Sequence, residues 1–246
     1  TREDIEQALK AQNPFQIVPS QDENGHGTQL AGIAAGSELA EDDFIGAAPE
    51  AMIAMVKLKE AKNYLKELFY VTGEAPAYQS SDIMMGIRYL VPVVICIGVG
   101  SNQGSHSGTS PLDFMLSITD NYRGLHAVVA AGNEAGKGHH YYGTAVSSDQ
   151  FDAVEILVEP DTQGFCVELW GQPPELYAVG FESPLGEVIP KIPPRISYSE
   201  KISFILEETR IFVTSEIVQT LSGQQLIFIR FSNPTPGPWK IRVYTS

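Results

Sequence analysis

The chain has 246 residues, enough for one large domain or two ordinary ones, and 43% of them are hydrophobic, enough to build a normal core. Its 16 Lys and Arg residues stand against 30 Asp and Glu residues, and the formal net charge of −14 excludes nucleic acid and anionic membranes as partners. No apolar run approaches the roughly 20 residues that cross a bilayer, and the start does not resemble a signal peptide.

Helix and strand segments alternate over the first part of the chain. TREDIEQALK (1–10) predicts an amphipathic helix, because Thr1 and Asp4 have the spacing of a capping box. The later segments are a strand at 51–58, a helix at 80–90, a strand at 91–99, a helix at 110–122 and a strand at 126–132. The last two strands are continuous apolar runs, which is typical of strands buried on both faces. This alternation predicts an α/β fold, with helices on both faces of a parallel sheet.

From about residue 148 the pattern changes to short strands separated by Gly, Pro and Ser turns. In PWKIRVYT, near the end of the chain, Trp239 and Ile241 alternate with Lys240 and Arg242, as in a half-buried strand. We therefore predict two domains, an α/β domain over 1–147 and an all-β sandwich or jelly roll over 148–246.

Aromatic side chains of the second half are expected to form its core. The residues concerned are Trp170, Phe181 and Trp239. A sugar-binding platform built from the same rings is the alternative, because jelly rolls also occur as lectins.

The cysteines and the paired histidines do not predict a metal centre. Cys96 and Cys166 lie in apolar strand segments, so we expect two buried free thiols. His139 and His140 are adjacent in a loop of Gly, Lys and Tyr, and a packed or solvated loop explains them better than a zinc site does. We expect neither a metal nor a cofactor.

One histidine, His26, stands between Gly25 and Gly27 where a helix of small residues is predicted to begin. A helix N-terminus lowers the affinity of a nearby imidazole for its proton, which suits a histidine that must be neutral to act as a base. Taken alone, a single histidine in this position is more often structural. Gly32 and Gly36 would cost a helix roughly 1 kcal/mol each, so close packing is expected to offset them.

The segment GHGTQLAGIAAG around His26 resembles the histidine signature of the subtilisin-like serine proteases, His-Gly-Thr followed by x-x-Ala-Gly. It departs from the commonest form at Gln29, where a second histidine often stands. The resemblance implies that His26 is the general base that takes the proton of a serine nucleophile.

Two further segments resemble the same family. VVAAGNEA (128–135) is similar to the segment that carries the oxyanion-hole asparagine, which implies that role for Asn133; a turn asparagine is the alternative. VVICIGVGSNQGSH lies where the family has a strand that lines the peptide groove and pairs with the substrate backbone. Gly98, Val99 and Gly100 take those places, with Gly98 instead of the usual serine.

The serine proteases of this family use a catalytic triad of Asp, His and Ser, and two of these three residues have no counterpart in this sequence. The family order is Asp, His, Ser, yet no Asp-Thr-Gly or Asp-Ser-Gly precedes His26, and we expect Asp22 and Glu23 to be solvated. The Gly-Thr-Ser at 108–110 comes before Asn133 and continues with proline. A helix cap explains it better, with Ser110 as the N-cap and Asp113 closing a capping box.

Within the superfamily, SNQGSHSGTSPLD and AAGNEAGKGHHYYG are similar to the clostridial germination proteases, which carry a jelly roll between the asparagine and serine segments. The resemblance implies an internal fragment of a serine endopeptidase with a peptide or protein substrate. We expect these 246 residues alone to be inactive, and to self-associate through surface that truncation exposes. It also implies a location outside the cell, or on the spore, of a Gram-positive bacterium.

Two other functions stay open. A non-catalytic relative, acting in germination signalling or assembly, would account for the missing aspartate and serine. Alternatively, the β half alone would bind a glycan or a partner protein. An Asp-Thr-Gly upstream and a Gly-Thr-Ser-x-Ala downstream in the full-length gene would favour the enzyme.

Overall fold

A computed structural model describes residues 1–73, 75–90, 94–119, 121, 124–144, 149–218 and 222–245. Two compact units make up the chain. The first comprises Thr1–Lys59, Ser81–Val99 and Gly124–Ala130; the second comprises Glu60–Ser80, Gly100–Arg123 and Ala131–Ser246. The predicted boundary at residues 147 and 148 lies outside the described residues and stays a prediction.

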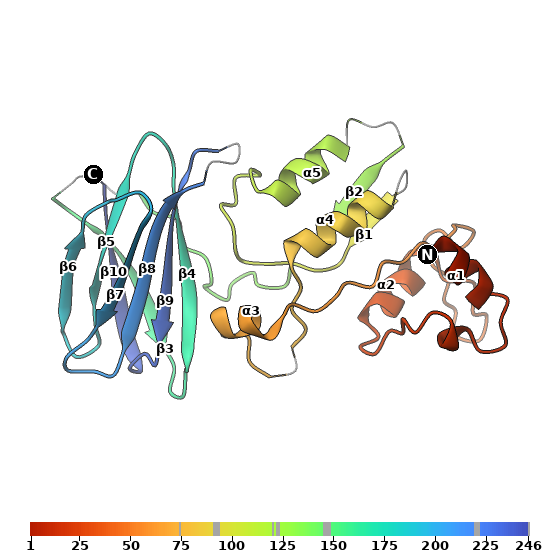
Figure 1. The fold of residues 1–246 in the computed structure, drawn as a ribbon, viewed down its shortest axis with the longest axis horizontal. Coiled ribbons are helices and arrows are strands. Elements are labelled where there is room, and N and C mark those ends of the chain that lie inside the picture. The colour runs from red at the N-terminus through yellow and green to blue at the C-terminus, as the bar shows by residue number, and fades with distance from the viewer. Residues whose placement is uncertain are drawn as a thin grey trace. The chain divides into compact units, whose positions relative to one another are not determined.

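The described residues of the first unit contain three α-helices and a short 3-10 helix: α1 (Arg2–Ala8), η1 (Pro14–Gln16), α2 (His26–Ala35) and, apart from its first residue, α4 (Ser80–Tyr89) (Figure 1). The predicted capping box of α1 is confirmed, because the Asp4 N–H donates to the Thr1 hydroxyl at 3.3 Å while the Asp4 carboxylate accepts from Thr1. The helix predicted over 80–90 is confirmed as α4. Among the described residues, no helix is both long enough and apolar enough to cross a bilayer.

Two strands of this unit form a parallel pair, as predicted. β1 (Val94–Ile97) lies beside β2 (His126–Val129), with Val94 opposite His126 and Ile97 opposite Val129. Burial on both faces was a wrong prediction: Ile95 is 5% exposed, but Val94 is 69% exposed and Cys96 is also exposed. The described part of this sheet has two strands, so it lacks the flanking strands and layers that bury an apolar strand on both sides.

The strand predicted over 51–58 is also wrong. This segment has no strand pairing in the structure, and Met52, Ile53 and Met55 are exposed. An apolar run forms a strand only where a neighbouring strand takes its backbone hydrogen bonds, and no described strand does so here. Parts of two other predicted segments lie outside the described residues. These are residues 91–93 of the strand predicted over 91–99, and residues 120, 122 and 123 in or next to the helix predicted over 110–122.

The second unit is built around a β-sandwich of two four-stranded antiparallel sheets (Figure 1). One sheet has the order β3 (Asp152–Val158), β10 (Gly237–Thr245), β5 (Tyr177–Glu182) and β6 (Val188–Ile192). The other has the order β4 (Gly164–Gly171), β9 (Gln225–Ser232), β8 (Arg210–Ile217) and β7 (Tyr198–Ser203). The first strand pairs with the last and the second with the last but one, as in a jelly roll, whereas the inner strands pair as the hairpins β5–β6 and β7–β8.

Alternating residues of the strands fill the core between the two sheets. In β10, Trp239 and Ile241 are buried while Lys240 and Arg242 lie on the other face and bind Glu182, so the predicted alternation is confirmed. Phe231 is fully buried and contacts Phe181 and Trp239 edge to face. Phe181 and Trp239 are therefore core residues, as predicted, whereas Trp170 is partly exposed and donates its indole N–H to Glu168.

The described part of the second unit also includes the helices α3 (Asn63–Leu68) and α5 (Pro111–Thr119). The predicted capping box of α5 is confirmed: the Ser110 N–H donates to Asp113 Oδ2, and the Asp113 N–H donates to the Ser110 hydroxyl oxygen, each at 3.1 Å. Ser110 is thus used as a helix cap. The carbonyls at the end of α3 accept hydrogen bonds from Arg230, whose guanidinium also lies over the Tyr70 ring.

Candidate active site

The helix that carries His26 begins at a carboxylate with four hydrogen bonds. Asp22 Oδ1 accepts from the N–H of Gly25 at 2.8 Å and of Asn24 at 3.1 Å. Its other oxygen accepts from the N–H of Thr28 at 2.9 Å and from the Thr28 hydroxyl at 2.6 Å. Asp22 therefore satisfies N–H groups that the first turn of α2 would otherwise leave unpaired, which Gly25, having no side chain, cannot do.

These hydrogen bonds also change the acidity of Asp22. The bond from the Thr28 hydroxyl, followed by those from the backbone N–H groups of Gly25 and Thr28, holds the pKa of this carboxyl well below its usual range. The prediction that Asp22 is merely solvated is incomplete, because the carboxylate, though exposed, anchors the histidine helix. An aspartate that precedes a turn is a known signal for such hydrogen bonds, and it was available in the sequence.

The imidazole of His26 contacts the segment that follows β1. Its Nε2 lies 2.9 Å from the carbonyl oxygen of Gly98, and since a carbonyl can only accept, Nε2–H is the donor. In the subtilisin-like mechanism, a histidine base accepts the serine proton at Nε2. His26 would therefore have to release this carbonyl and present an unprotonated Nε2 before it could act as that base.

Gly98 lies against side chains that a larger residue would have to displace. A Cβ atom at Gly98 would lie 2.2 Å from Leu30 Cδ1 and 3.5 Å from His26 Nε2. Leu30 is one helical turn after His26, so both side chains lie on the same face of α2. The glycine that replaces the usual serine is thus matched by the leucine that packs against it.

The predicted groove segment leaves the carboxyl end of the parallel sheet. Because β1 and β2 are parallel, the chain leaves both strands at the same edge, and the Ala130 N–H extends the pairing by donating to the Ile97 carbonyl at 3.0 Å. Ligands bind at such carboxyl edges in open α/β sheets. Gly98 and Val99 follow β1 in the first unit.

The other predicted site residues belong to the second unit. Asn133 is exposed, lies four residues after the end of β2 and follows Gly132, whose φ of +83° favours glycine. Gly100 is exposed too. The structure thus brings together His26 and Gly98, and the roles predicted for Asn133, Val99 and Gly100 stay predictions.

The described residues contain no group of three or more His, Cys, Asp or Glu side chains that could hold a metal ion. His139 instead pairs with Glu134 at 2.7 Å. Both cysteines are free thiols. Cys166 is partly buried, which raises the pKa of its thiol to about 11 and makes it a poor nucleophile, whereas Cys96 is exposed, contrary to prediction.

Replacing Asp22 with asparagine is expected to loosen the start of α2. The amide would turn a donor toward the Thr28 N–H, so hydrogen exchange at Thr28 should accelerate by about fivefold or more at neutral pH. The stabilisation by Asp22 is complete well above the unfolded carboxyl pKa of about 3.9 and is lost as the pH falls through its lower folded pKa. The difference between wild type and D22N, measured by hydrogen–deuterium exchange and thermal melting, should therefore shrink on acidification.

Glu23→Gln is the matched control, because it removes the same charge from the neighbouring residue, which accepts none of the hydrogen bonds that hold α2. Equal exchange at Thr28 in D22N and wild type would contradict the role of Asp22 as the anchor.

Comparison with known proteins places the fold and these motifs in one family. Residues 4–155 match the subtilase family, also called peptidase S8. The structure is similar to that of the CspB protease of Clostridium perfringens, with a TM-score of 0.77 and 27% sequence identity over 100% of this chain. The match covers 52% of that protease, so the chain spans about half its length. No curated protein matches the chain. A family match over more than half of the residues, in the part that holds His26 and Asn133, shows that this chain belongs to the subtilase family.

Proposed function

We propose that this chain supplies the histidine and the oxyanion-stabilising asparagine of a subtilisin-like serine endopeptidase. The observation that carries the proposal is the position of His26. It lies at the start of a helix anchored by Asp22, and its ring bonds to the Gly98 carbonyl at the carboxyl end of the parallel sheet. Membership of the subtilase family and the likeness to a clostridial protease support the same reaction class.

In the proposed mechanism, a serine outside these residues attacks the peptide carbonyl while His26 takes its proton and later gives it to the leaving amine. An aspartate, also outside these residues, orients the ring. The Asn133 amide donates to the oxygen on which negative charge develops. The backbone of Gly98, Val99 and Gly100 holds the substrate as an added strand on the non-prime side.

The non-catalytic alternative also has a specific observation in its favour. His26 Nε2 is bonded to a carbonyl, and these residues contain neither the aspartate nor the serine signature. A relative that keeps the fold for signalling or assembly would need neither. Exposed apolar residues of the first unit, such as Met52, Val94 and Val128, support self-association or a partner that covers them. The predicted cellular location stays a prediction.

The surrounding gene and an active-site label together test the proposal. We expect an Asp-Thr-Gly upstream and a Gly-Thr-Ser-x-Ala downstream, and a polypeptide spanning both should react with a fluorophosphonate at the serine and cleave casein. The 246 residues alone should do neither, because they lack the nucleophile. A gene without these motifs would favour the non-catalytic relative. Peptidase activity of the 246 residues that depends on His26 would contradict the predicted inactivity.

A further inference from the structure

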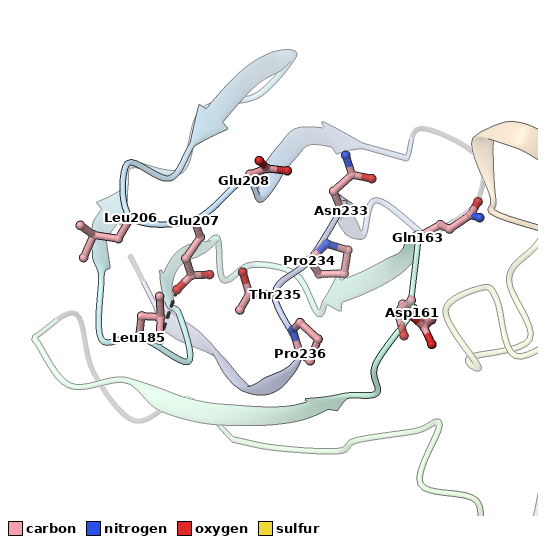
Figure 2. Close-up of a pocket in the computed structure, with 11 residues that line it drawn as sticks. Asp161, Gln163, Leu185, Leu206, Glu207, Glu208, Asn233, Pro234, Thr235 and Pro236 are labelled. Atoms are coloured by element: carbon pink, nitrogen blue, oxygen red, sulfur yellow. Dashed lines mark hydrogen bonds between the residues drawn. The ribbon is translucent and has the colours of Figure 1, made fainter.

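Four loops at one end of the β-sandwich enclose an open hollow of about 580 Å³, a volume in the range of small-ligand sites. They connect β3 to β4, β5 to β6, β7 to β8 and β9 to β10, and Figure 2 shows the side chains that line the hollow. We call this feature the acidic bowl. Its lining residues include Asp161, Leu185, Leu206, Glu207, Glu208 and Thr235.

The acidic bowl has the charge and the walls of a site for an organic cation. Three carboxylates line it, Asp161, Glu207 and Glu208, and no Lys, Arg or His among the described residues does. Leu185 and Leu206 add apolar walls and are 62% and 64% exposed. In a chain of net charge −14, this end of the sandwich attracts cations.

One buried oxygen of the bowl has no hydrogen-bond donor among the described residues. Glu207 is only 9% exposed; its Oε1 accepts from the Leu185 N–H at 3.2 Å, whereas its Oε2 is buried without a partner. Figure 2 shows this carboxylate between Leu185 and Thr235, inside the ring of lining residues. A buried carboxylate oxygen without a donor is costly, so a ligand that brings a donor to Oε2 gains an interaction already prepared for it.

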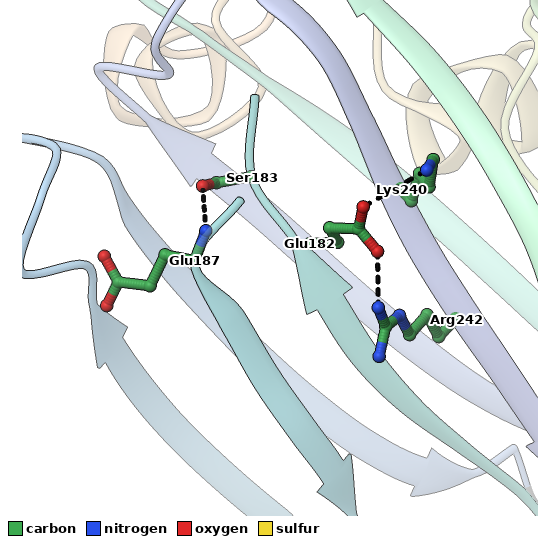
Figure 3. Close-up of polar contacts among 5 residues, drawn as sticks. All are labelled: Glu182, Ser183, Glu187, Lys240 and Arg242. Carbon is green, nitrogen blue, oxygen red and sulfur yellow. Dashed lines mark hydrogen bonds and ion pairs between the residues drawn. The ribbon is translucent and has the colours of Figure 1, made fainter. Parts of the chain in front are cut away.

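The walls of the bowl are braced against each other. The Glu187 carboxylate accepts from the N–H groups of Ile205 and Leu206, each at 3.0 Å, and so ties the β5–β6 turn to the β7–β8 loop. Within that turn, the Glu187 N–H donates to the Ser183 hydroxyl at 3.1 Å (Figure 3). These bonds fix the loop backbone that carries the exposed leucines before any ligand arrives, which lowers the entropy cost of binding.

Hydrogen bonds also join the other loops of the bowl. The Thr209 hydroxyl donates to the Asn233 carbonyl at 3.2 Å and accepts from the Thr235 N–H at 2.9 Å. The Asn233 N–H donates to the Gln163 carbonyl at 2.9 Å, which connects the β9–β10 loop to the β3–β4 loop. Nearby cations on β10 are already paired, since Lys240 and Arg242 both bind Glu182 (Figure 3).

We propose that the acidic bowl binds the side chain of an arginine from another polypeptide. A guanidinium presents five donors in one plane and is weakly hydrated, so it suits a carboxylate that lacks a donor, as Glu207 does at Oε2. Its methylene stem would cover the apolar walls at Leu185 and Leu206. A metal ion fits less well, because no three carboxylate, imidazole or thiolate groups converge in the described part of the chain. This inference does not depend on peptidase activity.

The test titrates the 246-residue protein, labelled with ¹⁵N, with Nα-acetyl-arginine methylamide. The amide signals of Leu185, Leu206 and Glu208 should shift and saturate with a Kd of roughly 1 mM or tighter. The same derivative of citrulline, which keeps the shape but loses the charge, should bind about tenfold more weakly or not at all. Nα-acetyl-lysine methylamide should also bind more weakly, because its ammonium is compact and strongly hydrated.

Glu207→Gln should weaken arginine binding by about tenfold or more, because an amide can still accept from Leu185 but turns a donor toward the ligand. Glu216→Gln, which removes an equal charge at the far end of β8, should leave the Kd within about twofold. Any of four results would overturn the proposal. They are equal binding of the arginine and citrulline derivatives, tighter binding of the lysine derivative, an unchanged Kd in a folded E207Q protein, and the absence of saturable shifts in the bowl.

Discussion

Replacing His26 with alanine, in a polypeptide that also contains the aspartate and serine segments, is expected to lower kcat/KM for a peptide substrate by at least about 10⁴-fold. The reason is that His26 is the proposed base, and no other described titratable side chain contacts Gly98 in the way its ring does. Initial rates on a chromogenic peptide measure the effect, and hydrogen exchange at Thr28 shows whether α2 stays formed. Gln29→Ala, one residue further along the same helix, should keep the rate within about threefold.

Asn133→Ala in the same polypeptide separates the two proposed roles. Loss of one oxyanion donor typically lowers kcat by about 10²–10³-fold and leaves KM nearly unchanged, because the donor acts on charge that exists only in the transition state. The expected order is therefore a larger loss for H26A than for N133A. A polypeptide that cleaves peptides equally well with and without His26 would remove the basis of the proposed function.

Local sequence predicts the structure correctly where the interacting residues are close in the chain. The capping boxes of Thr1 with Asp4 and of Ser110 with Asp113 each join residues three apart, so the local sequence contains both partners. The β-sandwich strands were predictable for the same reason, because alternation within one strand already separates its two faces.

Local sequence does not predict burial that depends on residues distant in the chain. Three segments have the apolar composition of buried strands, namely 51–58, 91–99 and 126–132. Burial also requires neighbouring strands and helices, which the local pattern does not specify. Asp22 is different, because the donors of its four hydrogen bonds lie within six residues of it, at Asn24, Gly25 and Thr28; its role as an anchor was missed although the local sequence contained the signal. Glu207 could not be singled out, because its surroundings come from four loops far apart in sequence.

Replacing Phe231 with alanine is expected to destabilise the second unit by about 3–5 kcal/mol. Phe231 is 0% exposed, stacks on Phe165 with ring centroids 4.5 Å apart, and meets Phe181 and Trp239 edge to face at 6.0 and 5.4 Å. These rings belong to strands of both sheets, so they cannot move together to fill the space without shifting backbone hydrogen bonds. The loss therefore includes a cavity in addition to the transfer free energy of the ring.

Urea unfolding followed by tryptophan fluorescence measures this loss in the second unit alone, because the chain has two tryptophans and both Trp170 and Trp239 belong to that unit. Phe212→Ala is the matched control, since Phe212 is 40% exposed on β8 and should cost no more than about 1 kcal/mol. Equal losses of stability for the two variants would mean that the space between the sheets is loosely packed. Backbone hydrogen bonds would then hold the sandwich together instead, in the outer strand pairs β3 with β10 and β4 with β9.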